Sequence, residues 1–180
     1  MYGIVNKAIE GLVIENFGPD RWEEIKIHAK VKEERFLTNE QYDDSITFRL
    51  AGSAAEVLDI PVKNILIQFG KYWVIKTARK HYGSLMDTGG NNLKDFVINL
   101  PNFHSRVMLL YPNIKPPEFK ITHIEENSLH LHYYSTRMGL TDFVEGLLIG
   151  LGEAFNTPVN VALLVSREKG ADHDEFGISW

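Results

Sequence analysis

The segment Leu100-Pro101-Asn102-Phe103-His104-Ser105-Arg106-Val107 places a histidine in the middle of an apolar helical pattern. An imidazole in such a stripe is either a core histidine with satisfied hydrogen bonds or a ligand to something that the core encloses. Pro101 predicts a kink here, or a division into two helices. Across residues 91–111 the apolar side chains follow the spacing of a helix with one buried face: Leu93, Phe96, Val97, Leu100, Val107, Met108 and Tyr111.

The rest of the N-terminal half is also expected to be helical. Apolar periodicity, prolines and capping residues mark the helix starts. We expect residues 81–92, which contain three glycines, to form a loop. The predicted helices cover residues 2–17, a second from Pro19, a third from 43–45 towards Leu58 and a fourth from Pro61 through Trp73.

The C-terminal half has the pattern of a small sheet. Alternating β-prone residues predict strands over 119–123 and 128–136, with a turn at 125–127. A clear helical pattern follows over 140–155, and two further strands are predicted at 159–165 and in a short segment ending at Trp180. We therefore predict an α+β fold: a helical N-terminal half and a small antiparallel sheet carrying one helix. At this length, one domain over residues 1–180 is expected.

Composition excludes several classes of function. The chain has no cysteine, so disulfides, thiolate-bound zinc and iron–sulfur clusters are excluded, and a metal would need histidine, carboxylate or tyrosine ligands. The net charge of -5, without a long basic run, gives no indication of nucleic-acid binding. Neither a signal peptide nor a membrane-spanning apolar run is evident, so we expect a cytoplasmic protein with no membrane partner.

The predicted strand over 128–136 ends in a group of polar side chains. Leu129 and Leu131 begin one face of the strand, and Tyr133, Ser135 and Arg137 continue it as a Tyr-x-Ser-x-Arg pattern. A phenol, a hydroxyl and a guanidinium together suit a ligand that carries carboxylates. The alternative is a strand that emerges into solvent and becomes polar for that reason.

Taken together, these features resemble the H-NOX family, the haem nitric oxide/oxygen-binding domains that include the sensor domain of soluble guanylate cyclase. A histidine about thirty residues before Tyr-x-Ser-x-Arg is the most specific part of the resemblance, which extends over the whole chain. The similar segments are 1–6, Tyr42-Asp43-Asp44, Phe69-Gly70, Trp73, His104, Pro116-Pro117, 132–137, Gly139-Leu140-Thr141 and 172–176.

The resemblance implies an H-NOX fold that encloses haem b, iron protoporphyrin IX. It implies that His104 is the axial ligand of the iron, and that Pro117 presses on the porphyrin. Tyr133, Ser135 and Arg137 are expected to hold the haem propionates. The side chains expected to face the open coordination position are Ile4, Ala8, Trp73, Phe143 and Leu147.

The function implied by the resemblance is a gas sensor without catalytic activity. Phe143 stands where oxygen-binding relatives usually carry a tyrosine and has no donor for bound oxygen, which favours nitric oxide and carbon monoxide. Nitric oxide is expected to release His104, relax its helix and let the porphyrin flatten against Pro117. Because 180 residues leave no room for a kinase or cyclase, the signal is expected to pass in trans to a protein such as a histidine kinase or a cyclic-nucleotide enzyme.

Three alternatives remain open from the sequence. The chain could bind oxygen, with the indole N–H of Trp73 as the distal donor. A peroxidase-like haem enzyme would need a distal acid or base, which neither Trp73 nor Phe143 provides. A haem-free interaction module would leave His104 as a core residue.

Other polar and glycine motifs receive structural interpretations. His130 and His132 could form a metal-binding pair, but we expect them to point to solvent. The cluster Asp172-His173-Asp174 is interpreted as polar surface. Gly146 and Gly150 are interpreted as sites of a close helix contact.

Overall fold

The computed structural model describes residues 1–111 and 116–180. Eight α-helices, one π-helix, one 3₁₀ helix and four strands follow one another in these residues. In chain order they are α1 (Gly3–Phe17), α2 (Pro19–His28), α3 (Asp44–Leu58), α4 (Val62–Tyr72), the π-helix η1 (Trp73–Ala78), α5 (Arg79–Asp87), α6 (Leu93–Ile98), α7 (Leu100–Leu110), β1 (Glu118–Thr122), β2 (Ser128–Tyr134), α8 (Thr141–Ala154), β3 (Asn160–Val165), η2 (Arg167–Lys169) and β4 (Asp174–Ser179).

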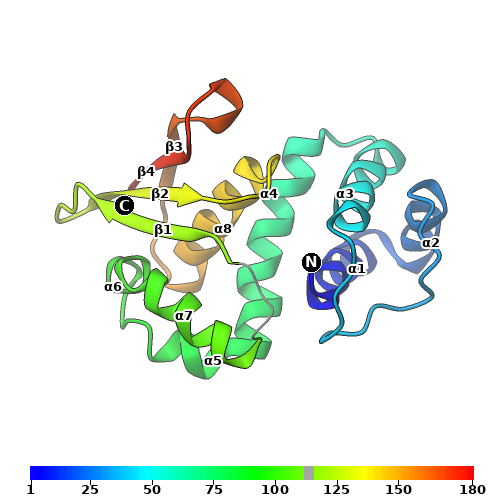
Figure 1. The fold of residues 1–180 in the computed structure, drawn as a ribbon, viewed down its shortest axis with the longest axis horizontal. Helices are drawn as coiled ribbons and strands as arrows, with labels where there is room; N and C mark the ends of the chain where they lie inside the picture. Colours follow the sequence, from blue (N-terminus) through cyan, green and yellow to red (C-terminus); the bar gives the residue numbers. More distant parts are fainter. Residues whose placement is uncertain (112–115) are drawn as a thin grey trace.

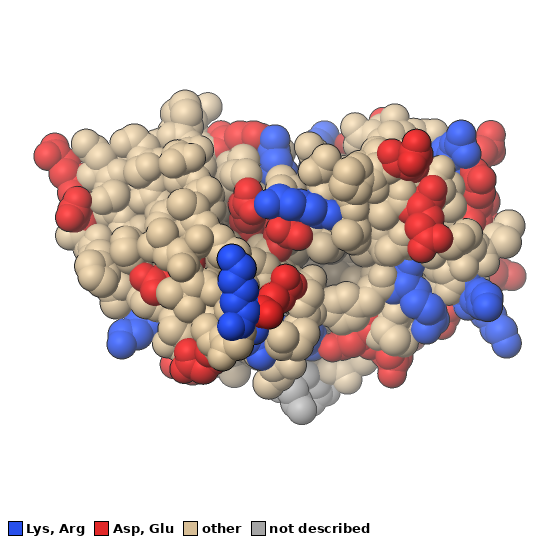
Figure 2. Space-filling model, turned by 90° about the horizontal axis from the view of Figure 1, so that it is seen from above, with Lys and Arg blue, Asp and Glu red and all other residues tan. Residues whose placement is uncertain are grey.

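The elements form two groups at opposite ends of the molecule. Helices α1, α2 and α3 lie at one end, and the sheet with α5, α6 and α7 lies at the other, with α4 between them (Figure 1). Each group has its own buried apolar cluster. Across the described ranges no helix has the length and apolar character needed to cross a membrane. Acidic and basic side chains are interspersed over the face seen in Figure 2.

The four strands form one antiparallel sheet in the order β1-β2-β4-β3. Helix α8 lies in the chain between β2 and β3, as the predicted α+β fold requires. The prediction of a helical N-terminal half followed by a small antiparallel sheet with one helix is confirmed. In the central strand β2, Tyr133 pairs with Phe119 of β1 and with Asp174 of β4, so residues from three strands meet at this register.

Local sequence signals explain where several helices begin. The side chain of Asp43 accepts a hydrogen bond from the backbone N–H of Ser45 at 2.8 Å and caps α3. Gly18 adopts a φ of 89° between α1 and α2, a conformation that glycine takes without a steric penalty. The side chain of Asn92 caps α6 by accepting from the N–H of Asp95.

Three sequence-based expectations need correction. Residues 81–92 are not all loop, because α5 continues to Asp87 and buries Tyr82 and Met86 in the core. The strand predicted over 128–136 ends at Tyr134, where neither β1 nor β4 continues as a pairing partner. At Pro101 the structure has the second of the two predicted alternatives, a division of the histidine helix into α6 and α7. Met108 is 42% exposed and does not belong to the buried stripe.

Helices α4 and α8 cross in close contact, and glycines allow this. A Cβ atom on Gly146 would overlap the carbonyl oxygen of Ile67, and one on Gly70 would overlap the backbone of Phe143. A Cβ on Gly150 would come 3.0 Å from the Cα of Lys71. The predicted close helix contact at Gly146 and Gly150 is therefore confirmed, and it fixes the positions of Phe143 and Leu147 on the same helix.

Candidate cofactor site

A cavity of about 750 Å³ lies between the two groups of elements. Its walls come from α1, α3, α4, α7, α8 and the segment after β2, and most of the lining side chains are apolar or aromatic. A few polar groups are concentrated at one end. Enclosed apolar pockets of this size with a small number of placed polar groups are typical binding sites for small molecules and cofactors.

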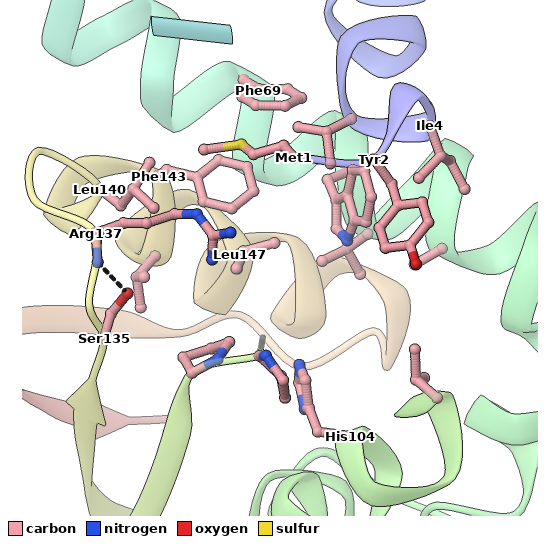
Figure 3. A pocket seen from close by; sticks show the side chains of 18 of the residues that line it. Met1, Tyr2, Ile4, Phe69, His104, Ser135, Arg137, Leu140, Phe143 and Leu147 are labelled. Carbon is pink, nitrogen blue, oxygen red and sulfur yellow. Dashed lines mark hydrogen bonds between the residues drawn. The ribbon is translucent and has the colours of Figure 1, made fainter. Parts of the chain in front are cut away.

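His104 of α7 reaches the cavity with one ring nitrogen already bonded. Its Nδ1 lies 3.0 Å from the carbonyl oxygen of Leu100, one helical turn earlier, and donates to it. Burial lowers the pKa of His104, and the hydrogen bond to Leu100 opposes this only in part. The imidazole is therefore neutral at pH 7, with the Nε2 lone pair unprotonated, which is the form that ligates metals. Figure 3 shows the ring pointing into the pocket.

The polar end of the cavity is formed by Tyr133, Ser135 and Arg137, the three residues of the Tyr-x-Ser-x-Arg pattern. The backbone N–H of Arg137 donates to the Ser135 hydroxyl at 3.1 Å (Figure 3). Burial raises the pKa of Tyr133, although Ser135 and the charge of Arg137 act in the opposite direction. These side chains lie together although β2 ends before Ser135 and Arg137.

Arg137 also links the two ends of the molecule. Its Nε donates to the carboxylate of Asp44, at the start of α3, at 2.6 Å, and the same carboxylate bonds the amino terminus. Burial opposes ionisation of Asp44, but the bonds from the amino terminus and Arg137 outweigh it and hold the pKa of Asp44 below its ordinary value. Arg167 donates to the carbonyl oxygens of Ser135 and Arg137 at 2.6 and 3.0 Å and so holds this segment in place.

The opposite wall of the cavity is apolar. Figure 3 shows Ile4, Phe143 and Leu147 across the pocket from His104. Trp73 also lines the cavity, at the first residue of the π-helix η1. The ring of Phe69 contacts Phe143 at a centroid distance of 4.7 Å. Within the described part of the chain, the indole N–H of Trp73 has no hydrogen-bond acceptor.

Nine of the ten sequence-predicted site residues line the cavity, and Ala8 does not. The nine are Ile4, Trp73, His104, Pro117, Tyr133, Ser135, Arg137, Phe143 and Leu147. Ala8 lies one turn after Ile4 on α1 and is buried in the apolar cluster of the N-terminal helices. Tyr72, next to Trp73 in the sequence, donates from its hydroxyl to Glu15 at 2.8 Å and is not a lining residue. Burial and Glu15 raise the pKa of Tyr72 to about 12.

Four tyrosines in the cavity wall were not predicted as site residues: Tyr2, Tyr42, Tyr82 and Tyr111. Tyr82 falls in the segment predicted as a loop, so its buried position was not anticipated. Burial and a hydrogen bond with Tyr111 raise the pKa of Tyr82. The ring of Tyr111 also contacts Tyr2 edge-on at 5.3 Å. The four-residue spacing of Tyr82 and Met86 was the available signal.

The described residues fit a haem group. The pocket supplies one neutral imidazole with a free nitrogen, an apolar volume, and an end whose hydroxyl and guanidinium donors suit carboxylates. Each of these corresponds to one part of the cofactor: its iron, its porphyrin and its propionates.

Comparison with known proteins agrees with this fit. The family model described as haem-NO-binding matches residues 2–163. The chain therefore belongs to the haem-NO-binding (HNOB) family.

Curated relatives include two soluble guanylate cyclases of Caenorhabditis elegans. Gcy-33 is 29% identical to this chain, in an alignment that covers 94% of this chain and 18% of gcy-33. Gcy-37 is also 29% identical, in an alignment that covers 94% of this chain and 24% of gcy-37. The chain thus spans a quarter or less of the first such relatives. Among solved structures, an H-NOX protein from S. oneidensis in the Fe(II)NO state has a TM-score of 0.90, with 24% identity over 99% of this chain and 98% of its own. An unliganded Fe(II) H-NOX protein from K. algicida has a TM-score of 0.87 and 23% identity, and the match covers 99% of this chain and 96% of that protein. The fold is thus that of H-NOX proteins.

Proposed function

We propose that this chain binds haem b through His104 and senses nitric oxide. The observation that carries the proposal is the His104 ring: its Nδ1 is bonded to Leu100, and its other nitrogen has no partner among the described residues and faces an apolar cavity of about 750 Å³. Buried polar atoms in a packed core are normally hydrogen-bonded, so an unpaired ring nitrogen that faces so large a cavity indicates a ligand site. Haem bound there would supply a ferrous iron with one open coordination position for nitric oxide or carbon monoxide.

The polar end of the cavity would hold the propionates. Tyr133, Ser135 and Arg137 offer two hydroxyls and a guanidinium, and such charge-assisted hydrogen bonds are stronger than neutral ones. Arg137 lines this end of the cavity while its Nε donates to Asp44, and a guanidinium has five N–H donors in all. Pro117, which also lines the cavity, would press on the porphyrin face.

The apolar wall supports selectivity for nitric oxide. Ile4, Phe143 and Leu147 contribute no donor to the cavity, and bound oxygen depends on a donor in a dry pocket more than nitric oxide does. These side chains would also exclude water. We expect no catalysis, because the described residues of this wall, Ile4, Phe143 and Leu147, offer no acid or base to assist a reaction.

Signalling would begin at His104 and pass through α7. If nitric oxide releases this imidazole, His104 no longer ties α7 to the cofactor, and the helix can shift. The last turn of α7 exposes Leu109 and Leu110. A partner protein in trans, such as a histidine kinase or a cyclic-nucleotide enzyme, would detect the new position.

Absorption spectra of the purified, reduced protein test this function. We expect a haem spectrum that air leaves unchanged apart from slow oxidation, and that nitric oxide shifts at once. Electron paramagnetic resonance would then show no histidine nitrogen bound to the iron after nitric oxide is added. A spectrum insensitive to nitric oxide would contradict the proposal.

The second candidate is oxygen binding with Trp73 as the donor. It is favoured by one observation: the Trp73 indole lines the cavity and its N–H has no acceptor among the described residues. Trp73→Phe separates the two functions. If the wild type takes up oxygen stably and this variant does not, oxygen sensing replaces nitric oxide sensing. Failure of both proteins to take up oxygen stably supports the first proposal.

A further inference from the structure

A second cluster of potential ligands lies on the other face of β2. His130 and His132 alternate with the buried residues of that strand, so they face away from the cavity side that Tyr133 occupies. Glu175 of β4 is the direct cross-strand partner of His132. His173, two residues before Glu175, completes the group, in which each side chain is partly buried.

Three donor atoms of this cluster converge. His132 Nδ1 lies 2.9 Å from His173 Nε2 and 3.9 Å from Glu175 Oε2. All three donors fall within 4.8 Å of one another. Ligand atoms around a tetrahedral Zn²⁺ at 2.0–2.2 Å lie about 3.3–3.6 Å apart, so small side-chain rotations would suffice to place an ion between them.

The other polar atom of each side chain is already held by a neighbour. The Thr122 hydroxyl lies 2.7 Å from His132 Nε2, and His173 Nδ1 donates to Asp172 at 2.6 Å. The remaining oxygen of Glu175, Oε1, lies 2.7 Å from His130 Nδ1. Histidines that bind metals usually have their second nitrogen held in this way, by a carboxylate or another polar group, which sets the tautomer and the ring orientation.

We propose that His132, His173 and Glu175 form a binding site for a divalent transition-metal ion, with Zn²⁺ the best match. Two imidazoles and one carboxylate suit zinc, and a water molecule would occupy the fourth position. Glu175 and Asp172 offset the charge of Lys120, which faces His132 across the β1–β2 pair. The ion would join β2 and β4 to the connection that precedes β4, and so stabilise the sheet against unfolding.

Zinc binding to the haem-loaded protein tests the site, since occupied haem keeps His104 unavailable. We expect about one Zn²⁺ per chain after chelator treatment, measured by calorimetry and by metal analysis of the dialysed protein. Co²⁺ in the same site would give the intense visible bands of a four-coordinate ion. A wild-type protein that binds no Zn²⁺ overturns the proposal, whatever its haem content.

Substitutions of single residues test which side chains bind the metal ion. His132→Gln and His173→Gln should each abolish stoichiometric binding, and Asp172→Asn should weaken it about tenfold to a hundredfold by freeing the His173 ring. His81→Gln, at an exposed histidine of α5, is the matched control and should bind as the wild type does. A Soret band equal to that of the wild type would show that each variant is folded. Loss of binding in His123→Gln but not in His173→Gln would overturn this ligand set in favour of His123, His130 and Glu175.

Discussion

The two ring nitrogens of His104 have different surroundings, and that difference defines the site. The bond from Nδ1 to the Leu100 carbonyl fixes both the tautomer and the direction of the ring. The helical spacing alone indicated a histidine in an apolar stripe but could not show whether the stripe faced a filled core or a cavity. That distinction depends on α1, α4 and α8, which are remote in the sequence.

At the propionate end, Arg137→Ala should weaken haem retention. Loss of a charged donor to a partly buried carboxylate costs about 1–3 kcal/mol, so we expect haem transfer to an excess of apomyoglobin to become about 5-fold to 150-fold faster. Arg79→Ala, which breaks only the exposed pair with Asp87, is the matched control and should leave the transfer rate unchanged. Equal rates in wild type and Arg137→Ala would remove Arg137 from the haem site.

Asp44 gives a prediction for how the free energy of unfolding depends on pH. Its folded-state pKa lies below its unfolded value, so its contribution to stability is present above the ordinary pKa of about 3.8 and is lost as the pH falls through the folded pKa. The free energy of unfolding in urea should therefore be lower in Asp44→Asn than in wild type at neutral pH. The difference should shrink as the solution is acidified below pH 3.8. A difference that stays constant with pH would assign the effect to packing.

Residues that come together from distant segments were the hardest to predict. The sequence reasoning considered His130 and His132 separately from Asp172-His173-Asp174 and interpreted both as polar surface. The antiparallel pairing of β2 with β4 sets His132 opposite Glu175 and brings His173 beside it. Ala8 differs in the opposite way, since the family resemblance assigned it to the cavity and the structure buries it in the apolar cluster of the N-terminal helices.

At the scale of elements, local signals were sufficient where capping and periodicity agree. The Asp43 cap of α3 and the alternation in β2 are present in the structure as predicted. The π-helix η1 was not predicted, because the fourth predicted helix runs through Trp73 and residues 74–78 have no assignment. The end of β2 depends on where its partner strands stop, which the residues of β2 itself do not encode.

The crossing of α4 and α8 gives a prediction for stability. Gly146→Ala would force the two backbones apart, and overpacking of this kind costs about 1–3 kcal/mol of unfolding free energy, measured by urea denaturation. Gly52→Ala in α3 is the matched control: nothing lies within 4 Å of its added Cβ, so it should stabilise the protein by about 0.5–1 kcal/mol. Equal effects of the two substitutions would mean that the close crossing is absent in solution.

At the scale of the whole molecule, the cavity lies between two apolar clusters, and Val5 and Trp73 pack against both of them. The Arg137–Asp44 pair bridges them at one end, and the α4–α8 crossing bridges them at another. A cofactor between them would add a further connection. A change in how His104 binds that cofactor would then alter the position of α7 relative to the N-terminal helices, which is what a sensor requires.

The most direct test of the account is the absorption spectrum of the reduced wild-type protein beside that of His104→Gly, with and without added imidazole. The account predicts a haem band in both proteins, a changed spectrum in the variant, and restoration of the wild-type spectrum when imidazole fills the space left by the side chain. His81→Gly should keep the wild-type spectrum throughout. An unchanged spectrum in His104→Gly, or a wild-type protein that takes up no haem on reconstitution, would contradict the claim that His104 holds haem in this cavity.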